Sequence, residues 1–161
     1  MRELPPDPHH RVVVHTDGGA RGNPGPAGIG AVMTDEEGHV LAERAEGIGP
    51  ATNNVAEYKA AIAGLELALE HGAKEVLLRA DSRLIVEQLA GRFRVKNPTL
   101  QVLHQQARSL MKRFERVELE HVRRERNADA DLLANVGIDA WLATPEGAAY
   151  RPPEPPGSLL S

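Results

Sequence analysis

The stretch RVVVHTDGGARGNPGPAGIGAVMT, residues 11–34, places two apolar segments around a segment rich in glycine and proline. Residues 11–17 contain a β-branched run, which predicts a buried strand ending at Asp17. Residues 18–26 hold four Gly and two Pro, which predicts an irregular loop, and residues 27–34 predict a second strand. An acid at the end of a buried strand is costly unless it is paired or bound to a metal. Asp17 is therefore a candidate functional residue.

The pattern after this stretch continues with one more strand and then alternates helices and strands. Residues 35–38 predict a turn and 39–47 a third strand, with Gly49-Pro50 ending the unit. Helical spacing of apolar residues then predicts a helix capped by Thr52 or Asn53 and stopped at His71-Gly72. Further elements are predicted in the order strand 75–80, helix 81–90, basic loop 91–98, helix 98–113, a strand around 117–119 and helix 127–142.

This order of elements predicts an α/β fold with one mixed five-stranded sheet. Three consecutive strands form an antiparallel meander, the later strands join it in parallel, and helices cover both faces. We expect an arm over residues 1–10, a single domain over 11–142 and a Pro-rich tail over 143–161.

Composition excludes several classes of protein. The 161 residues include no cysteine, which rules out disulfides, thiolate zinc sites and a cysteine nucleophile. There is no apolar run of membrane-spanning length and no apolar stretch typical of a signal peptide near Met1, so a cytoplasmic location is expected. Apart from His121, which is considered below, the histidines show no spacing typical of metal ligands.

Charge is strongly segregated along the chain. The formal net charge is −4, yet residues 92–126 hold 10 Lys/Arg and only 4 Glu. Such a basic block can face the phosphates of a nucleic acid. A solvated helix face explains the same charges equally well.

Four acids fall at the ends of predicted strands and helices, namely Asp17, Glu57, Asp81 and Asp131. In an open α/β sheet such ends gather in one crevice, and oxygen ligands suit Mg²⁺ or Mn²⁺. Each acid also has a structural explanation. Glu57, in the first helical turn, and Asp81 would favour helix N-termini, Asp81-Ser82 would cap a helix, and Asp131 would be solvated.

Four segments resemble the motifs of type 1 ribonuclease H, in the same order and over roughly residues 11–140. They are TDGGARGNPGPAG at 16–28, TNNVAE at 52–57, Asp81-Ser82 after an apolar strand, and RERNADADLLA at 124–134. The resemblance implies an endoribonuclease that hydrolyses the RNA strand of RNA–DNA hybrids and leaves 5′-phosphates.

The resemblance also implies a two-metal mechanism with Mg²⁺, or Mn²⁺ as the alternative. Asp17 would bridge both ions, Asp131 would help hold the ion that activates water, and Glu57 and Asp81 would hold the other ion.

Substrate selection requires groups that recognise the 2′-OH of RNA. Gly18 and Gly19 would let the backbone approach the minor groove. By family position, Asn23, Asn53 and Asn54 would contact the hybrid and Thr52 would touch a DNA phosphate. A turn residue for Asn23 and helix caps for Thr52 and Asn53 are the alternatives.

Two departures from the family pattern matter. The long basic insertion that many members carry after the third motif is replaced by residues 91–98, which is typical of a compact, handle-less subgroup. Hybrid binding would then depend more on Arg92, Arg94 and Lys96. The flexible Gly-His loop before the fourth acid is missing, which favours Arg124 as the residue that assists the phosphate, with His121 as the alternative.

Three functions remain open at this point: a hybrid-specific endonuclease acting as a monomer without a membrane partner, another nuclease of the same superfold, or a non-catalytic binding module. The Asn53-Asn54 pair and Gly18-Gly19 favour the first, and the presence of all four acids disfavours the last.

Overall fold

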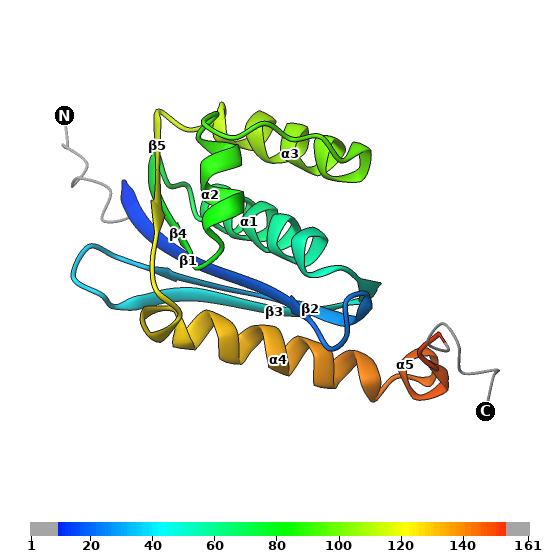
Figure 1. Ribbon diagram of the computed structural model, residues 1–161. Helices are drawn as coiled ribbons and strands as arrows, with labels where there is room; N and C mark the ends of the chain where they lie inside the picture. The colour runs from blue at the N-terminus through cyan, green and yellow to red at the C-terminus, as the bar shows by residue number, and fades with distance from the viewer. Residues whose placement is uncertain (1–9, 154–161) are drawn as a thin grey trace, which may run out of the picture.

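The computed structural model describes residues 10–153, so most of the predicted arm and the end of the predicted tail lie outside the described residues. One five-stranded sheet has the order β3-β2-β1-β4-β5, with helices on both faces (Figure 1). The predicted fold class is confirmed.

The sheet combines an antiparallel meander with two parallel strands. β1 (Arg11–Ala20), β2 (Gly25–Thr34) and β3 (Val40–Ala51) pair antiparallel in sequence order. β4 (Glu75–Ala80) pairs parallel with β1, and β5 (Arg116–His121) pairs parallel with β4. β1 is the central strand, so Asp17 lies on the strand that joins the antiparallel meander to the parallel strands β4 and β5.

The glycine-rich segment is more regular than predicted, since β1 continues to Ala20 and β2 begins at Gly25. Gly18 pairs with Ile29 and Gly19 with Gly28, so the ladder runs on past Asp17. The Arg21 N–H donates to the Pro26 carbonyl at 2.8 Å and closes the turn. Glycine keeps its backbone donor and acceptor, so the ladder outweighs the weak strand preference of glycine.

β3 also extends beyond its predicted end at Gly49-Pro50. Its register with β2 shifts between Ala27 and Gly28, where Ile48 is the extra residue, and Gly49 has φ +74°. A bulge of this kind lets a strand absorb an extra residue and continue. β3 is an edge strand, where proline is tolerated.

Three helices lie on one face of the sheet: α1 (Asn53–Glu70), α2 (Arg83–Leu89) and α3 (Pro98–Met111) (Figure 1). Each begins at a side-chain cap, supplied by Thr52, Ser82 and Asn97 respectively. The main core fills the space between β1, β4, α1 and α3. Residues 90–97 link α2 directly to α3, with no further helix or strand between them.

α4 (Ala128–Leu142) covers the other face, after a short 3₁₀ turn η1 (Arg124–Arg126). It packs against β2 and β3 at backbone distance, because the facing positions are Gly28, Gly30 and Gly47. A Cβ on Gly30 would collide with the Ala130 carbonyl oxygen, and one on Gly28 with that of Ala134. The glycines therefore set the height of α4 above the sheet.

The predicted tail is not wholly irregular. Residues Pro145–Ala149 form the short helix α5, which Thr144 caps through a hydrogen bond from the Gly147 N–H. Trp141 of α4 packs edge-on against Tyr150, with 5.9 Å between the ring centroids. Within residues 10–153, no helix is long and apolar enough to cross a bilayer.

Candidate active site

The carboxylates of Asp17, Glu57 and Asp81 converge from three different elements. Oxygens from the three side chains lie within 4.8 Å of one another. Asp17 belongs to β1, Glu57 to α1, and Asp81 follows the last residue of β4. Asp17 is 6 % exposed and Glu57 9 %. Asp131, on α4, lines the same cavity, whose volume is about 450 Å³.

Two of these acids sit differently in their helices than predicted. Glu57 is not in the first turn of α1, which holds no acid. It lies one turn further in, and its Oε1 accepts a hydrogen bond from the Gly18 N–H at 3.3 Å. Ser82, not Asp81, caps α2 by accepting from the Ile85 N–H. Neither carboxylate is therefore used to cap a helix.

The protonation of the cluster reflects its burial and its concentration of like charge. Burial, followed by the nearby charges of Glu57 and Asp81, raises the pKa of Asp17 to about 10. Burial is also the main cause that raises the pKa of Glu57 to about 7. Removal from water and neighbouring negative charge both disfavour a carboxylate anion. Without a bound cation the cluster therefore retains protons at neutral pH.

Asn127 joins the start of α4 to β1 beside the acids. It is 1 % exposed, and its Nδ2 donates to the Thr16 carbonyl at 2.9 Å. Its own carbonyl accepts the Asp131 N–H at 3.1 Å. One residue thus links the strand that carries Asp17 to the helix that carries Asp131.

Arg124 and His121 both lie close to Asp81. The Nε of Arg124 is 3.8 Å from Asp81 Oδ2, and Arg124 lines the acid cavity with its side chain 86 % exposed. His121 Nε2 lies 3.2 Å from the backbone carbonyl of Asp81 and does not line that cavity. The geometry thus places the arginine, and not the histidine, in the wall of the cavity.

The glycines after Asp17 have different surroundings. A Cβ on Gly18 would collide with the Ala56 carbonyl of α1, so α1 packs against the backbone of Gly18, which also lines the acid cavity. Gly19 has no heavy atom within 4 Å of its Cβ position among the described residues. Gly19 lines the acid cavity as well.

Two of the four polar residues predicted to contact the substrate, Asn23 and Asn53, hold the turn between β1 and β2 against α1. Asn53 Oδ1 accepts the Ala20 N–H at 2.9 Å, and Asn23 Oδ1 accepts the Asn53 N–H at 3.0 Å. Thr52 caps α1. Asn54 is exposed and lines both the acid cavity and a neighbouring one of about 550 Å³, which Asn23 and Thr52 also line.

The predicted basic residues lie outside the acid cavity. Arg92 is paired with Glu87, with 2.9 Å between Nη2 and Oε1. Arg94 and Lys96 are exposed, while the backbone carbonyls of Arg94 and Val95 accept hydrogen bonds from glutamine side chains. Asn97, next along the chain, lines the cavity that holds Asn23 and Thr52. The loop therefore borders the neighbouring cavity.

Among the residues in the wall of the acid cavity to which sequence reasoning gave no role are Arg21 and Asn135, both with polar side chains. The signal for Asn135 was its spacing of four residues from Asp131, which puts both on one face of a helix. Arg21 had no such signal, since it lies in the turn and approaches α4 only in the folded chain.

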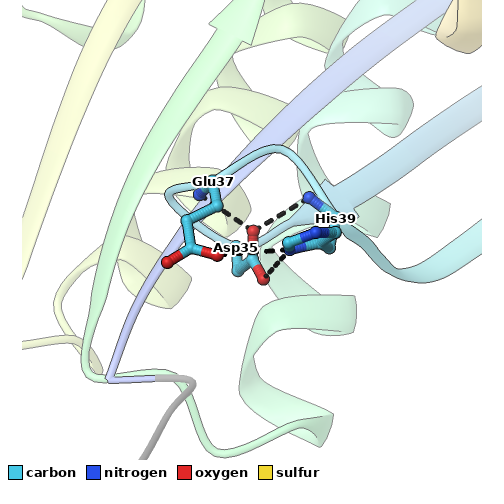
Figure 2. A group of neighbouring side chains, drawn as sticks. All are labelled: Asp35, Glu37 and His39. Carbon is cyan, nitrogen blue, oxygen red and sulfur yellow. Dashed lines mark hydrogen bonds and ion pairs between the residues drawn. The ribbon is translucent and has the colours of Figure 1, made fainter.

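Another group with metal-ligand chemistry, not expected from histidine spacing, occupies the turn between β2 and β3. Figure 2 shows Asp35, Glu37 and His39 gathered there. Asp35 Oδ1 accepts the backbone N–H groups of Glu37 and His39, both at 2.9 Å, and its Oδ2 lies 3.0 Å from His39 Nδ1. These hydrogen bonds close the turn, which accounts for the cluster.

Cavity size does not mark the candidate active site. A larger cavity, about 860 Å³, lies between α1 and α3 and is lined by residues such as Ile62, Val102 and Leu110. None of the residues predicted from the motifs lines it. Chemistry, in the form of converging carboxylates, points to the smaller cavity.

The acid cavity suits divalent cations by its donor set. All four acids offer oxygen ligands, and such ligands match hard cations. The Oε2 atom of Glu57 is buried and has no hydrogen-bond partner among the described residues. A buried carboxylate oxygen in this condition is costly, and a bound cation would remove the cost.

Comparison with known proteins agrees with the motifs and the fold. Residues 15–137 match the family described as Reverse transcriptase-like. The chain is 43% identical to ribonuclease HI of Halobacterium salinarum over 134 residues, 83% of this chain and 67% of that protein. It is 53% identical to a bifunctional protein of Mycobacterium tuberculosis over 81% of this chain, but spans only 36% of that relative.

Solved structures give the same result. The N-terminal RNase H domain of the Mycobacterium tuberculosis protein has TM-score 0.79 and 52% identity, covering 81% of this chain and 94% of that one. LC11-RNase H1, solved in complex with an RNA/DNA hybrid, has TM-score 0.78 and 46% identity, covering 82% and 99%. On the motifs, the fold and these matches together, the chain belongs to the type 1 ribonuclease H family.

Proposed function

We propose that this protein is a metal-dependent endoribonuclease that hydrolyses the RNA strand of RNA–DNA hybrids and leaves 5′-phosphate ends. The observation that carries the proposal is the convergence of Asp17, Glu57 and Asp81, with Asp131 in the same cavity. Family membership supports the reaction. The hybrid bound to LC11-RNase H1, a relative at 46% identity, supports the substrate.

We assign the four acids as the ligands of two Mg²⁺ ions, with Mn²⁺ as the alternative. When bound, such a pair of cations supplies an activated water and stabilises the leaving 3′ oxygen of an in-line displacement. The protein would hold the four carboxylates in place, and the carboxyl groups would release their protons when the cations bind. Asn127 supports this arrangement, since it bonds to the backbone on both sides of the cluster.

Arg124 is our candidate for the residue that assists the phosphate. Its guanidinium lies at the edge of the cavity next to Asp81 and keeps most of its surface exposed. Arginine stays charged at neutral pH, so it can neutralise a phosphate oxygen but cannot accept the proton of the attacking water. We assign no proton transfer to it.

Hybrid recognition is proposed to involve residues on both sides of the turn between β1 and β2. Asn53, Asn54 and the backbone at Gly18-Gly19 border the acid cavity, and Asn23, Thr52 and Asn54 border the neighbouring one. Arg92, Arg94 and Lys96 would extend the contact through phosphate charges. We further propose that the protein acts as a monomer in the cytoplasm.

The test is a cleavage assay on one labelled RNA strand with Mg²⁺. The strand is presented alone, paired with RNA and paired with DNA. We expect cleavage of the hybrid only. Asp17→Asn, Glu57→Gln and Asp81→Asn should each lose more than the roughly 10- to 100-fold that loss of a ligand's supporting partner costs.

Asp129→Asn is the matched control, since it removes an exposed carboxylate of α4 that does not line the acid cavity. It should cleave like the wild type. Equal cleavage of all three substrates would instead indicate a broader nuclease. Binding without cleavage would indicate a non-catalytic module.

A further inference from the structure

Arg21 is held at the wall of the acid cavity by two residues of α4. Its Nη1 donates to Asp139 Oδ1 at 2.7 Å, and its Nη2 donates to Asn135 Oδ1 at 3.2 Å. Asn135 in turn donates from its Nδ2 to the Asp131 carbonyl at 3.1 Å. A chain of hydrogen bonds therefore runs from the helix turn that carries Asp131 to the guanidinium of Arg21.

The position of this guanidinium follows from helix geometry. Asp131, Asn135 and Asp139 are spaced four residues apart, so they share one face of α4. At 1.5 Å per residue, Arg21 is bound roughly 6 to 12 Å along the helix axis from Asp131. Arg124 lies before α4 begins, on the side of Asp81. Along the direction of α4, the two arginines of the cavity wall therefore lie on opposite sides of Asp131.

The chemistry of Arg21 leaves it able to bind an anion. A guanidinium has five N–H donors in a rigid plane, and Asp139 and Asn135 engage two of its nitrogens. The side chain is 42% exposed, and it lines the cavity while Asp139 does not. Because both contacts fix its plane, little rotamer entropy remains to be lost when a phosphate binds.

We propose that Arg21 binds a backbone phosphate of the cleaved strand, next to the scissile phosphate and on the side away from Arg124. This proposal rests on the proposed function, because it takes the strand in the acid cavity to be the RNA of a hybrid. Arg21 is a substrate-positioning residue in this account and takes no part in bond breaking. The competing explanation is that Arg21 only holds the turn between β1 and β2 against α4.

The first experiment measures hybrid cleavage by Arg21→Gln, Arg21→Lys and Asp139→Ala over a range of salt. We expect Arg21→Gln to raise KM about tenfold with little change in kcat, and to reduce the slope of log KM against log salt by about 0.9, the value for one phosphate contact. Arg21→Lys should keep most of the slope. Asp139→Ala removes the partner of Arg21 Nη1 but retains the positive charge of Arg21, so this variant should keep the full slope.

The second experiment identifies the strand. Phosphates flanking the cut are replaced one at a time by neutral methylphosphonates, in the RNA and then in the DNA strand. One replacement in the RNA should weaken wild-type binding by several fold and leave Arg21→Gln unaffected. An unchanged salt slope in Arg21→Gln, an equal KM rise in Asp139→Ala, or an effect confined to the DNA strand would overturn the proposal.

Binding by fluorescence anisotropy, measured on the same variants without cleavage, separates this proposal from the proposed function. If the wild type binds hybrid but does not cut it, the nuclease assignment fails. The salt slope of binding and the methylphosphonate comparison still decide whether Arg21 contacts the strand.

Discussion

At the scale of single residues, the site depends on acids that are costly to fold without a cation. Asp17 and Glu57 are buried beside each other and beside Asp81, and their pKa values rise to about 10 and about 7. In an unfolded chain both would titrate near their ordinary values of 3.8 and 4.5. The folded protein therefore holds more protons than the unfolded chain between these limits.

These raised pKa values make the free energy of unfolding of the metal-free protein depend on pH. Where the native state binds more protons than the unfolded state, the free energy of unfolding falls as pH rises. We expect the metal-free protein to lose stability between about pH 5 and about pH 8, and Mg²⁺ to restore it at the higher pH. Asp17→Asn should be more stable than the wild type at the higher pH without metal, by about 1–3 kcal/mol.

Urea unfolding with a chelator at the two pH values measures this effect. Asp129→Asn, which removes an exposed carboxylate, should retain the pH dependence of the wild type. Identical pH dependence in Asp17→Asn and wild type would contradict the assignment of the raised pKa to Asp17.

At the scale of elements, the position of Asp131 depends on how closely α4 approaches the sheet. Gly30 pairs with Asp17 across the ladder and faces the Ala130 carbonyl, one residue before Asp131. The absence of a side chain at Gly30 thus brings the fourth acid down to the level of the other three. The spacing of small residues on α4, with Ala130, Ala134 and Gly137 buried, complements these glycines.

Gly30→Ala should therefore affect both stability and metal binding. Its Cβ would meet the backbone of α4, and overpacking of this kind costs about 1–3 kcal/mol. Because relief requires α4 to move outward, Mg²⁺ affinity should fall as well. Thermal unfolding and calorimetric Mg²⁺ titration measure the two effects.

Gly19→Ala is the matched control for stability, since a Cβ there has open space. Its unfolding free energy should stay within about 0.5 kcal/mol of the wild type. A Gly30→Ala protein with wild-type stability and Mg²⁺ affinity would show that α4 is not held at backbone distance in solution.

At the scale of the whole molecule, an acidic protein carries a basic segment beside its candidate site. Residues 92–126 hold 10 of the 19 Lys and Arg residues. Within this block Arg92 is paired with Glu87, whereas Arg94 and Lys96 are exposed on the loop that leads to Asn97, a residue of the neighbouring cavity. Phosphate contacts should therefore depend unequally on the three.

The double variant Arg94→Glu/Lys96→Glu should weaken hybrid binding and reduce the salt slope by up to about 1.8, for two phosphate contacts. Arg92→Glu should have a smaller effect, because the two carboxylate oxygens of Glu87 already engage both Nε and Nη2 of Arg92. Anisotropy titrations at several salt concentrations measure both.

Lys112→Glu/Arg113→Glu makes the same charge change just past the C-terminal end of α3, after Met111, away from both cavities that hold the predicted residues. It should leave the slope close to that of the wild type. If this control lowers the slope as much as the loop variant does, net charge alone governs binding and the loop has no specific role.

The sequence by itself determined the order and type of the main elements, since hydrophobic periodicity, caps and turn residues are local properties. It also determined which acids to consider, because Asp17, Glu57, Asp81 and Asp131 fall within recognisable motifs. Local conformational preference predicted strand ends that were too early in the glycine-rich segment and at Gly49-Pro50. At both places, pairing with a neighbouring strand outweighs the local preference.

Only the tertiary structure decided how the side chains are used. Gly18 serves helix packing, Asn23 and Asn53 hold the turn, and Arg21 reaches residues more than 100 positions away in the chain. The physical reason is that burial, shared charge and hydrogen-bond partners depend on distances in space. The raised pKa of Asp17 is a property of three chain segments brought together by folding, which the local sequence around Asp17 does not encode.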